Sequence, residues 1–516
     1  MSDAKPQEAP TVNVFAVHGA DPEVQAYAMA KYSRSALSMK ESLKELNEQK
    51  AEQFLNTFYF QYGHRSIADL AHVAFAIEKL SLLAAIVLVD EQRWDGQERS
   101  TRYQNFKKSG YYTPEFGSDT ASRDLYTQTA QMLFTEYEIL SEGMFRYLEE
   151  RTPKPAEMDQ AQYDRTLKAR AFDISRYLLP LATNTSLGQI VNARTLETQI
   201  ARLLSHPYGE VRQLGELLKQ AAREPAYNVS HNRLKEVLEQ VRAVDAGLAE
   251  KIAPDLLRDV RVSPTLVKYA VANTYEMETR AQLRQAAGEL MKGVAIAPAR
   301  SVELLDDDPL EVELATTLLY GQCHYSYNQL RGPVSAMTDA QRREIIDLGL
   351  NKRGKHDELL RPFCAGQKFR FDVLMDVGGF RDMHRHRRCT QIEQGFTALH
   401  GYDEPEDIRP SGMKDRYRDV MKRAAEAAAQ VAKGTSAEAE QNSHYLLPLA
   451  FRKRCLFNMD FAEVVYISEL RTTEAGHQSY RNVAYAMYEA AAKKYPALKQ
   501  YFRVTDVHAP VDLLKR

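Results

Sequence analysis

The second half of the sequence holds a dense run of basic residues, RDMHRHRR at positions 381–388. Arg381 and Arg385 are four residues apart, and Arg388 follows three residues later, so on a helix the three guanidinium groups share one face. Such groups repel one another unless an anion lies against them, and their paired N–H donors suit phosphate oxygens. The run therefore predicts an anion-binding face. A solvated basic patch or an RNA contact is the alternative, but Gly378-Gly379 and an apolar strand pattern just upstream favour the edge of a core.

A second polar run, QERSTRY at positions 97–103, follows a helical stretch and Gly96. The hydroxyl groups of Ser100 and Thr101 can hold a monophosphate together with Arg102, and Glu98 can accept a hydrogen bond from a sugar hydroxyl. The pattern is typical of a nucleotide-recognition loop, with an ordinary polar surface loop as the alternative.

These two runs belong to an internal repeat. Leu-Pro-Leu occurs at 179–181 after Arg-Tyr-Leu and again at 447–449 after His-Tyr-Leu, and His-x-Ser occurs at 64–66 and 324–326. Apolar residues alternate with a period of two in 73–77 and in 369–375, which predicts a half-buried strand in each copy. A helix follows each strand, over 81–91 and 378–388, and the second copy carries an insertion near 331–367.

Elsewhere the periodicity predicts helices over 22–46, 124–150, 192–222, 232–252, 414–433 and 460–494. The expected fold class is α+β and helix-rich, with two tandem copies and a small sheet in each. The join falls near 244–263, so we expect a first copy over 1–245 and a second over 255–516.

Composition narrows the class of protein. Lys and Arg total 68 against 70 Asp and Glu, so no global field attracts nucleic acid or an anionic membrane, and neither is an expected partner. Four cysteines without paired spacing favour a reducing compartment, and no apolar run is long enough to span a bilayer. A cytoplasmic protein is expected.

The two polar runs together resemble the signature of flavin-dependent thymidylate synthases, R-H-R-x-x-S-x-N-E-x-S-x-R-Y. The second copy is similar to its front, with Arg385-His386-Arg387, Thr390 and Glu393, and departs from its back. The first copy is similar to its back, with Glu98, Ser100, Arg102 and Tyr103, and reads Asp90-Glu91-Gln92 where R-H-R is expected. Each copy retains what the other lacks.

The same division continues downstream of Leu-Pro-Leu. The family pattern has an Arg before it, then an Asn, an Arg and a further Arg after it. The first copy supplies Arg176, Asn192 and Arg194, and the second supplies Arg471. The resemblance implies active sites that draw residues from different copies of the domain.

By this resemblance the nucleotide is bound by Glu98, Ser100, Thr101, Arg102, Arg176, Arg385 and Arg471, of which Arg385 and Arg471 are catalytic. It implies FAD bound by His64, Ser66, Asp69, Asn192, Arg194, Arg385, His386, Arg387 and Glu393. A histidine that packs a helix start is the alternative for His64. The histidines lack a ligand spacing, so no metal site is expected. The four cysteines receive no catalytic role.

The implied reaction is transfer and reduction of a one-carbon unit from methylenetetrahydrofolate to C5 of dUMP, giving dTMP, with FAD as hydride carrier and NADPH as reductant. A flavin enzyme acting on another uracil nucleotide and an inactive nucleotide- or RNA-binding scaffold of the same fold stay open. A fused pair of copies predicts a homodimer that repeats the family's tetrameric core.

Overall fold

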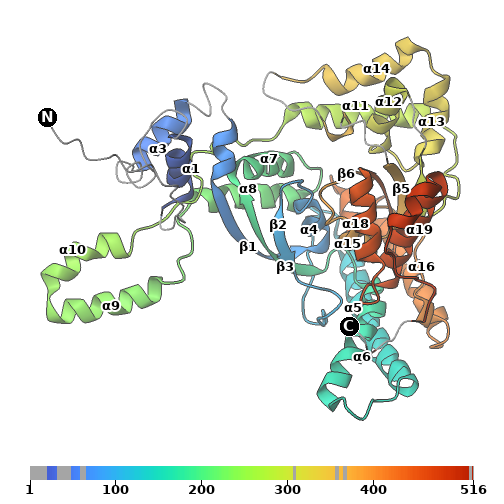
Figure 1. The fold of residues 1–516 in the computed structure, drawn as a ribbon, viewed down its shortest axis with the longest axis horizontal. Helices are drawn as coiled ribbons and strands as arrows, with labels where there is room; N and C mark the ends of the chain where they lie inside the picture. Colours follow the sequence, from blue (N-terminus) through green and yellow to red (C-terminus); the bar gives the residue numbers. More distant parts are fainter. Residues whose placement is uncertain are drawn as a thin grey trace, which may run out of the picture. The chain divides into compact units, whose positions relative to one another are not determined.

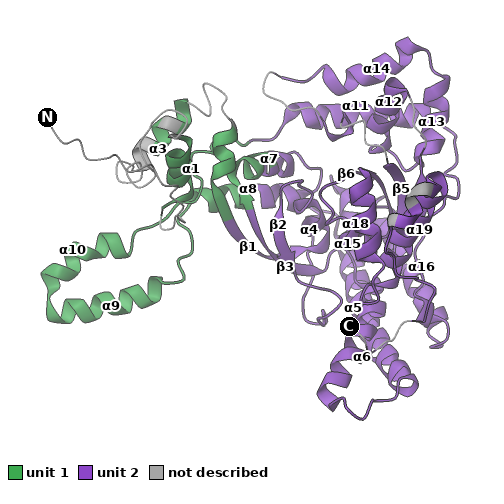
Figure 2. Cartoon of the chain, viewed as in Figure 1, with its two compact units in different colours: residues 1–73, 191–198, 217–270 green, residues 74–190, 199–216, 271–516 purple. Residues whose placement is uncertain are grey.

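The computed structural model describes residues 20–31, 48–57, 65–305, 309–354, 360–363, 369–510 and 514. The chain forms two compact units (Figure 2), and neither follows the sequence continuously. Unit 1 comprises 1–73, 191–198 and 217–270, and unit 2 comprises 74–190, 199–216 and 271–516. The predicted division of the chain into 1–245 and 255–516 stays a prediction.

Unit 1 is helical. It contains α1 (Pro22–Lys31), α3 (Glu48–Leu55), the 3-10 helix η2 (Arg65–Leu70), α9 (His231–Val244) and α10 (Ala246–Leu256). Its small core gathers side chains from distant parts of the sequence, namely Ala26, Leu55, Ile67, Ala68, Ala71, Ala193 and Leu266. Asp245 separates α9 from α10, and its carboxylate caps α10 by accepting from the Leu248 N–H at 2.9 Å.

The strands form two sheets, one for each copy of the repeat. The first has the order β1-β3-β2, with β1 (His72–Ser81), β2 (Asp95–Glu98) and β3 (Asn184–Asn192). The second has the order β4-β5-β7-β6, with β4 (Val302–Leu304), β5 (Phe369–Asp376), β6 (Thr390–Glu393) and β7 (Arg452–Met459). β1 and β5 contain the two predicted period-2 segments. The expected α+β fold is confirmed.

The Leu-Pro-Leu segments pair with each other, as two equivalent elements do around a local two-fold axis. The Leu181 N–H donates to the carbonyl of Leu447 at 2.9 Å, and the Leu449 N–H donates to the carbonyl of Leu179 at 2.9 Å. Both prolines lie in this bridge, where their missing N–H groups leave no donor unpaired. The repeat read from the sequence is therefore also a structural repeat.

In each copy, an N–H group at the beginning of a helix donates to a carbonyl of that copy's Leu-Pro-Leu segment. The Leu83 N–H, at the beginning of α4 (Leu82–Leu88), donates to Leu181 O at 3.1 Å. The Gly378 N–H, at the beginning of α15 (Val377–Met383), donates to Leu449 O at 3.0 Å. Leu83 and Gly378 are thus equivalent positions in the two copies. When the copies are aligned on this pair, Asp90-Glu91-Gln92 of the first copy correspond to Arg385-His386-Arg387 of the second.

Figure 1 also shows the remaining helices. They are α5 (Thr120–Arg151), α6 (Gln160–Ser175), η3 (Arg176–Leu178), α7 (Ala193–Leu204), α8 (Gly209–Arg223), α11 (Thr274–Leu290), α12 (Leu310–Tyr320), α13 (Tyr327–Ala336), α14 (Asp339–Leu350), η4 (Arg361–Phe363), η5 (Glu406–Ile408), α16 (Lys414–Val431), α17 (Ala439–His444), α18 (Phe461–Arg471), α19 (Gln478–Lys494) and η6 (Pro496–Tyr501). No helix among the described residues is long and apolar enough to cross a membrane.

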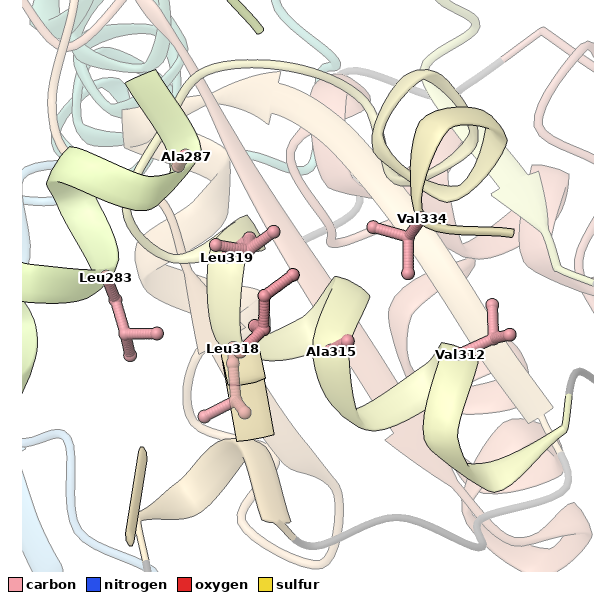
Figure 3. Close-up of a cluster of buried hydrophobic side chains, with 8 residues drawn as sticks. Leu283, Ala287, Val312, Ala315, Leu318, Leu319 and Val334 are labelled. Carbon is pink, nitrogen blue, oxygen red and sulfur yellow. The ribbon is translucent and has the colours of Figure 1, made fainter. Parts of the chain in front are cut away.

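The helices α11 to α14 form a cluster of their own in the second copy (Figure 3). Leu283 and Ala287 of α11 pack with Leu318 and Leu319 of α12, and Val334 of α13 completes the contact. Val334 of α13 and Ile345 of α14 belong to the insertion, so its described helices share an apolar core with α11 and α12.

Four helix predictions need correction. The pattern over 232–252 is split into α9 and α10 at Asp245. Of the helix predicted over 22–46, α1 covers the first part, and 32–46 lie outside the described residues. The pattern over 192–222 is split into α7 and α8 around Pro207, which cannot donate within a helix. The pattern over 460–494 is split into α18 and α19 around Gly476. The basic helix face was wrong, because α15 ends at Met383 and Arg385 and Arg388 lie in the turns that follow.

Candidate functional site

The Glu98 loop is positioned by a short strand pair. β2 runs antiparallel to β3, with Glu98 opposite Leu187, and the Arg99 N–H still donates to Ser186 O at 2.9 Å. The chain then turns, so that Thr101 and Arg102 are buried while Tyr103 is exposed. The Arg102 N–H donates to Ser100 Oγ at 3.2 Å, which fixes the turn.

This loop meets the second copy through Arg381. The Arg381 guanidinium forms a buried ion pair with Glu98, Nη2 to Oε1 at 2.5 Å, and Nη1 donates to Thr101 Oγ1 at 3.2 Å. Both side chains are less than a tenth exposed. Removing either partner of a pair buried at this depth would leave an uncompensated charge where the two copies meet.

Arg176 lies beside the same hydroxyl group. Its Nη1 donates to Thr101 Oγ1 at 3.4 Å, whereas Nε and Nη2 are buried without a hydrogen-bond partner. The residue is 1% exposed and forms no ion pair with the described residues, and burial lowers the pKa of its guanidinium. Arg381 Nε is also buried without a partner. Buried N–H donors that lack acceptors, on two adjacent cations, form a cradle for an anion.

Arg102 has a different environment, because a carboxylate already lies against it. Its Nε and Nη2 donate to the two oxygens of Asp173 at 2.7 and 3.2 Å, and Nη2 also donates to Ala475 O at 3.0 Å. Its Nη1 donates to the Tyr480 hydroxyl at 3.0 Å. The Arg471 guanidinium lies 5.5 Å from the same Tyr480 ring. Tyr480 thus links Arg102 of the first copy to Arg471 of the second.

In the predicted segment Arg385-His386-Arg387, the first side chain is exposed and the other two contact neighbouring side chains. Arg471 Nε donates to His386 Nε2 at 2.8 Å, and His386 Nδ1 lies 3.3 Å from Glu463, so the imidazole is oriented from both sides. Burial lowers the pKa of His386. Arg387 lies over the ring of Trp94 at 4.4 Å. Arg385 is exposed, and its side chain forms no ion pair with the described residues.

The equivalent place in the other copy carries the opposite charge. Arg361, from the inserted segment, pairs with Asp90 at 2.5 Å, and Arg202 pairs with Glu91 at 2.8 Å. Burial is the largest influence on the pKa of Asp90 and raises it, but the charges of Arg361, His384 and Arg202 together with the hydrogen bond from Arg361 outweigh burial and hold the pKa below its usual value. These carboxylates are neutralised by arginines of the chain itself.

Glu393 lies in the same group of side chains as Asp90. Its carboxylate lies 3.4 Å from His384 Nδ1 and 3.0 Å from Lys453 Nζ. Asp90, His384 and Glu393 bring their ligand atoms within 4.8 Å of one another, as a metal site would, but each carboxylate already carries a cation partner.

The other predicted cofactor residues lie in unit 1. Arg194 and Asp69 form an ion pair at 3.3 Å, and Asn192 caps α7 by accepting from the Thr195 N–H at 2.8 Å. Ser66 is exposed, and His64 lies outside the described residues.

Three residues of the site are absent from the predicted set, namely Asp173, Tyr480 and Arg381. Arg381 belongs to the basic run, and its spacing from Arg385 predicts a shared helix face. The structure instead pairs Arg381 with Glu98. Asp173 precedes Arg176 by three residues on a helical pattern, which places both on one face. No pattern in the sequence distinguishes Tyr480 from the other tyrosines.

Fold and site together define a two-copy α+β protein with a cluster of buried arginines to which both copies contribute. The family model described as thymidylate synthase complementing protein matches residues 15–226 and 310–497, one segment in each copy. The chain belongs to this family, as the sequence resemblance predicted, and it is a divergent, tandem-duplicated member.

Two relatives align with this chain over nearly its whole length. A UPF0159 protein of Chlamydia pneumoniae is 28% identical over 98% of this chain and 93% of its own length. A UPF0159 protein of Thermoplasma acidophilum is 24% identical over 93% of this chain and 94% of its own. A flavin-dependent thymidylate synthase of Clostridium tetani is 24% identical and covers 40% of this chain with 81% of its own length.

Two solved structures each match 39% of the chain. A UMP/dUMP methylase from Streptomyces cacaoi, with 5-Br dUMP, is 17% identical over 39% of this chain and 84% of its own, with a TM-score of 0.29. A flavin-dependent thymidylate synthase from Helicobacter pylori, with FAD and dUMP, is 16% identical over 39% of this chain and 89% of its own, with a TM-score of 0.27.

Proposed function

We propose that this protein transfers and reduces a one-carbon unit from methylenetetrahydrofolate onto C5 of dUMP, giving dTMP, with FAD as hydride carrier and NADPH as reductant. Family membership and the flavin-dependent thymidylate synthase among its relatives support this class of reaction. The single observation that carries the nucleotide site is Arg176, a buried guanidinium with two unpartnered nitrogen atoms.

The nucleotide phosphate is expected in the cradle of Arg176, Arg381 and Thr101. Two cations face that cradle with three unpartnered nitrogen atoms, Arg176 Nε and Nη2 and Arg381 Nε, and a phosphate supplies acceptors for all of them. Glu98 and Ser100 flank the cradle and are assigned to the sugar. Arg102 contributes charge while Asp173 and Tyr480 hold its geometry.

The chain must also activate the pyrimidine. Uracil C5 is a weak nucleophile, and it becomes competent when negative charge that develops on the ring oxygens is stabilised. Arg471, oriented by His386 and Tyr480, is our candidate for that role. Arg385 is the second candidate, and its exposed side chain is free to reorient toward a bound nucleotide.

The residues present fit an anionic flavin nucleotide. Arg387 Nε and Nη2 are buried without a hydrogen-bond partner, and the charges of Asp95 and Asp90 offset only part of the effect of burial on its pKa. We assign Arg387, with His386 and Glu393, to FAD, together with His64, Ser66, Asp69, Asn192 and Arg194. When bound, FAD would supply the redox chemistry, and the chain would supply binding and orientation.

The test is direct. The purified chain should carry flavin absorbance and should form dTMP from dUMP, methylenetetrahydrofolate and NADPH, with UMP as the competing substrate. Turnover of UMP in preference to dUMP would move the assignment to another uracil nucleotide. A chain that binds neither flavin nor uracil nucleotide would refute the proposed function.

A further inference from the structure

We propose that Trp94 is a positioning residue that holds Arg387 with its free N–H edge toward the phosphate of the flavin cofactor. This inference rests on the proposed function, and it assigns a role to the single tryptophan of the chain.

Trp94 is fixed from several sides. It is 5% exposed, and its indole Nε1 donates to Gln189 Oε1 of β3 at 2.7 Å. Gly96 leaves room for the ring, because a Cβ at this position would lie 2.5 Å from Trp94 Cη2. The ring is therefore a rigid surface, and its position does not depend on Arg387.

Arg387 rests on that surface. Its guanidinium carbon lies 4.4 Å from the indole centroid, a favourable cation–π distance, and Nη1 donates to Arg385 O at 3.4 Å. Nε and Nη2 remain buried without a partner. These two nitrogen atoms form the edge of the guanidinium that binds an oxyanion with two parallel hydrogen bonds. Burial lowers the pKa of Arg387, so an anion at this edge would also compensate a desolvated charge.

The pair occurs once in the described repeat, because it is built across the two copies. Trp94 comes from the first copy and Arg387 from the second. In the register set by Leu83 and Gly378, the counterpart of Trp94 is Cys389 and the counterpart of Arg387 is Gln92. The reciprocal position thus has neither the aromatic face nor the cation.

The experiment measures FAD affinity of the full-length chain by titration, together with a thermal unfolding curve for each variant. Trp94→Leu removes the aromatic face and should weaken FAD binding about tenfold, and Trp94→Phe keeps a weaker face and should lose about threefold. Phe106→Leu is the matched control. Phe106 lies under Arg99 at 4.1 Å, but all three nitrogen atoms of that guanidinium have partners, so FAD affinity should not change.

A double-mutant cycle separates positioning from general stability. In an Arg387→Ala background, Trp94→Phe and Trp94→Leu should cause no further loss of FAD affinity, because the group that Trp94 holds is gone. Because Trp94 is the sole tryptophan, FAD should also quench the intrinsic emission of the wild-type chain.

Equal losses in both backgrounds would overturn the inference, as would full FAD affinity in folded Trp94→Leu. In either case the wild-type chain binds FAD and the proposed function stands. If Trp94→Leu does not fold, the cycle with Trp94→Phe decides. A wild-type chain that binds no FAD overturns the proposed function and this inference together.

Discussion

Replacing Arg176 with Met should stabilise the ligand-free protein and abolish nucleotide binding, two effects of opposite sign from one change. The guanidinium is fully buried, and its one hydrogen bond to the described residues joins Nη1 to Thr101 at 3.4 Å. A desolvated cation without a carboxylate costs folding free energy, and replacing buried charges with apolar side chains of similar volume often stabilises by about 1–4 kcal/mol. The melting temperature of Arg176→Met should therefore rise by a few degrees.

The effect on binding follows from the two unpartnered nitrogen atoms. Each charge-assisted hydrogen bond to phosphate contributes about 1.5–3 kcal/mol, so the loss of both costs about 3 kcal/mol or more. That corresponds to at least roughly a hundredfold weaker dUMP binding by calorimetry.

Arg454→Met is the matched control for stability. Arg454 is equally buried, but it pairs with the fully buried Asp372 at 2.8 Å. Removing it leaves an uncompensated carboxylate and should destabilise by about 3–5 kcal/mol. A lower melting temperature for Arg176→Met, or dUMP affinity within threefold of the wild type, would refute the assignment of Arg176 as an anion site.

The remaining predictions concern the cofactor, the nucleotide loop, acid stability and stoichiometry. Arg387→Ala should give a folded chain with little flavin absorbance, whereas Glu91→Gln should keep its flavin; equal loss from both would contradict the asymmetry of the copies. Arg102→Ala should weaken dUMP binding by about 1.5–3 kcal/mol in calorimetry with little change in flavin content, and unchanged affinity would exclude the loop. Burial lowers the pKa of His444 from 6.5 to about 4, so its contribution to stability is present above pH 6.5 and is lost as the pH falls toward 4; denaturant midpoints across this window should decline less steeply in His444→Gln. Light scattering with flavin absorbance should give a homodimer with one FAD per chain, and two equivalent flavins per chain would disprove a single competent site per chain.

The repeat and its division of labour could be predicted from the sequence because they depend on matched short segments. Leu-Pro-Leu, the alternating strands and the complementary halves of one signature are each local, and the structure pairs the two Leu-Pro-Leu segments directly. The helix ends were less predictable. A basic run with helical spacing says nothing about where the helix stops, and α15 ends before Arg385 because the chain turns there to enter β6.

The charge balance of the site could not be predicted, because it depends on partners far away in the sequence. Arg102 and Arg176 both match the family pattern. Asp173 forms an ion pair with Arg102, whereas two nitrogen atoms of Arg176 have no partner. Asp173 lies three residues before Arg176, and this spacing does not predict whether its carboxylate pairs with Arg176 or with the distant Arg102. On the acidic side, Asp90 and Glu91 predict repulsion of phosphate, but Arg361 and Arg202 fill that position with internal cations. The carboxylates of Asp90 and Glu91 already have cationic partners, whereas Arg176 and Arg387 have unpartnered donors that a ligand oxyanion can satisfy. The difference between the two copies therefore lies less in how many charges each retains than in which charges the chain has already paired.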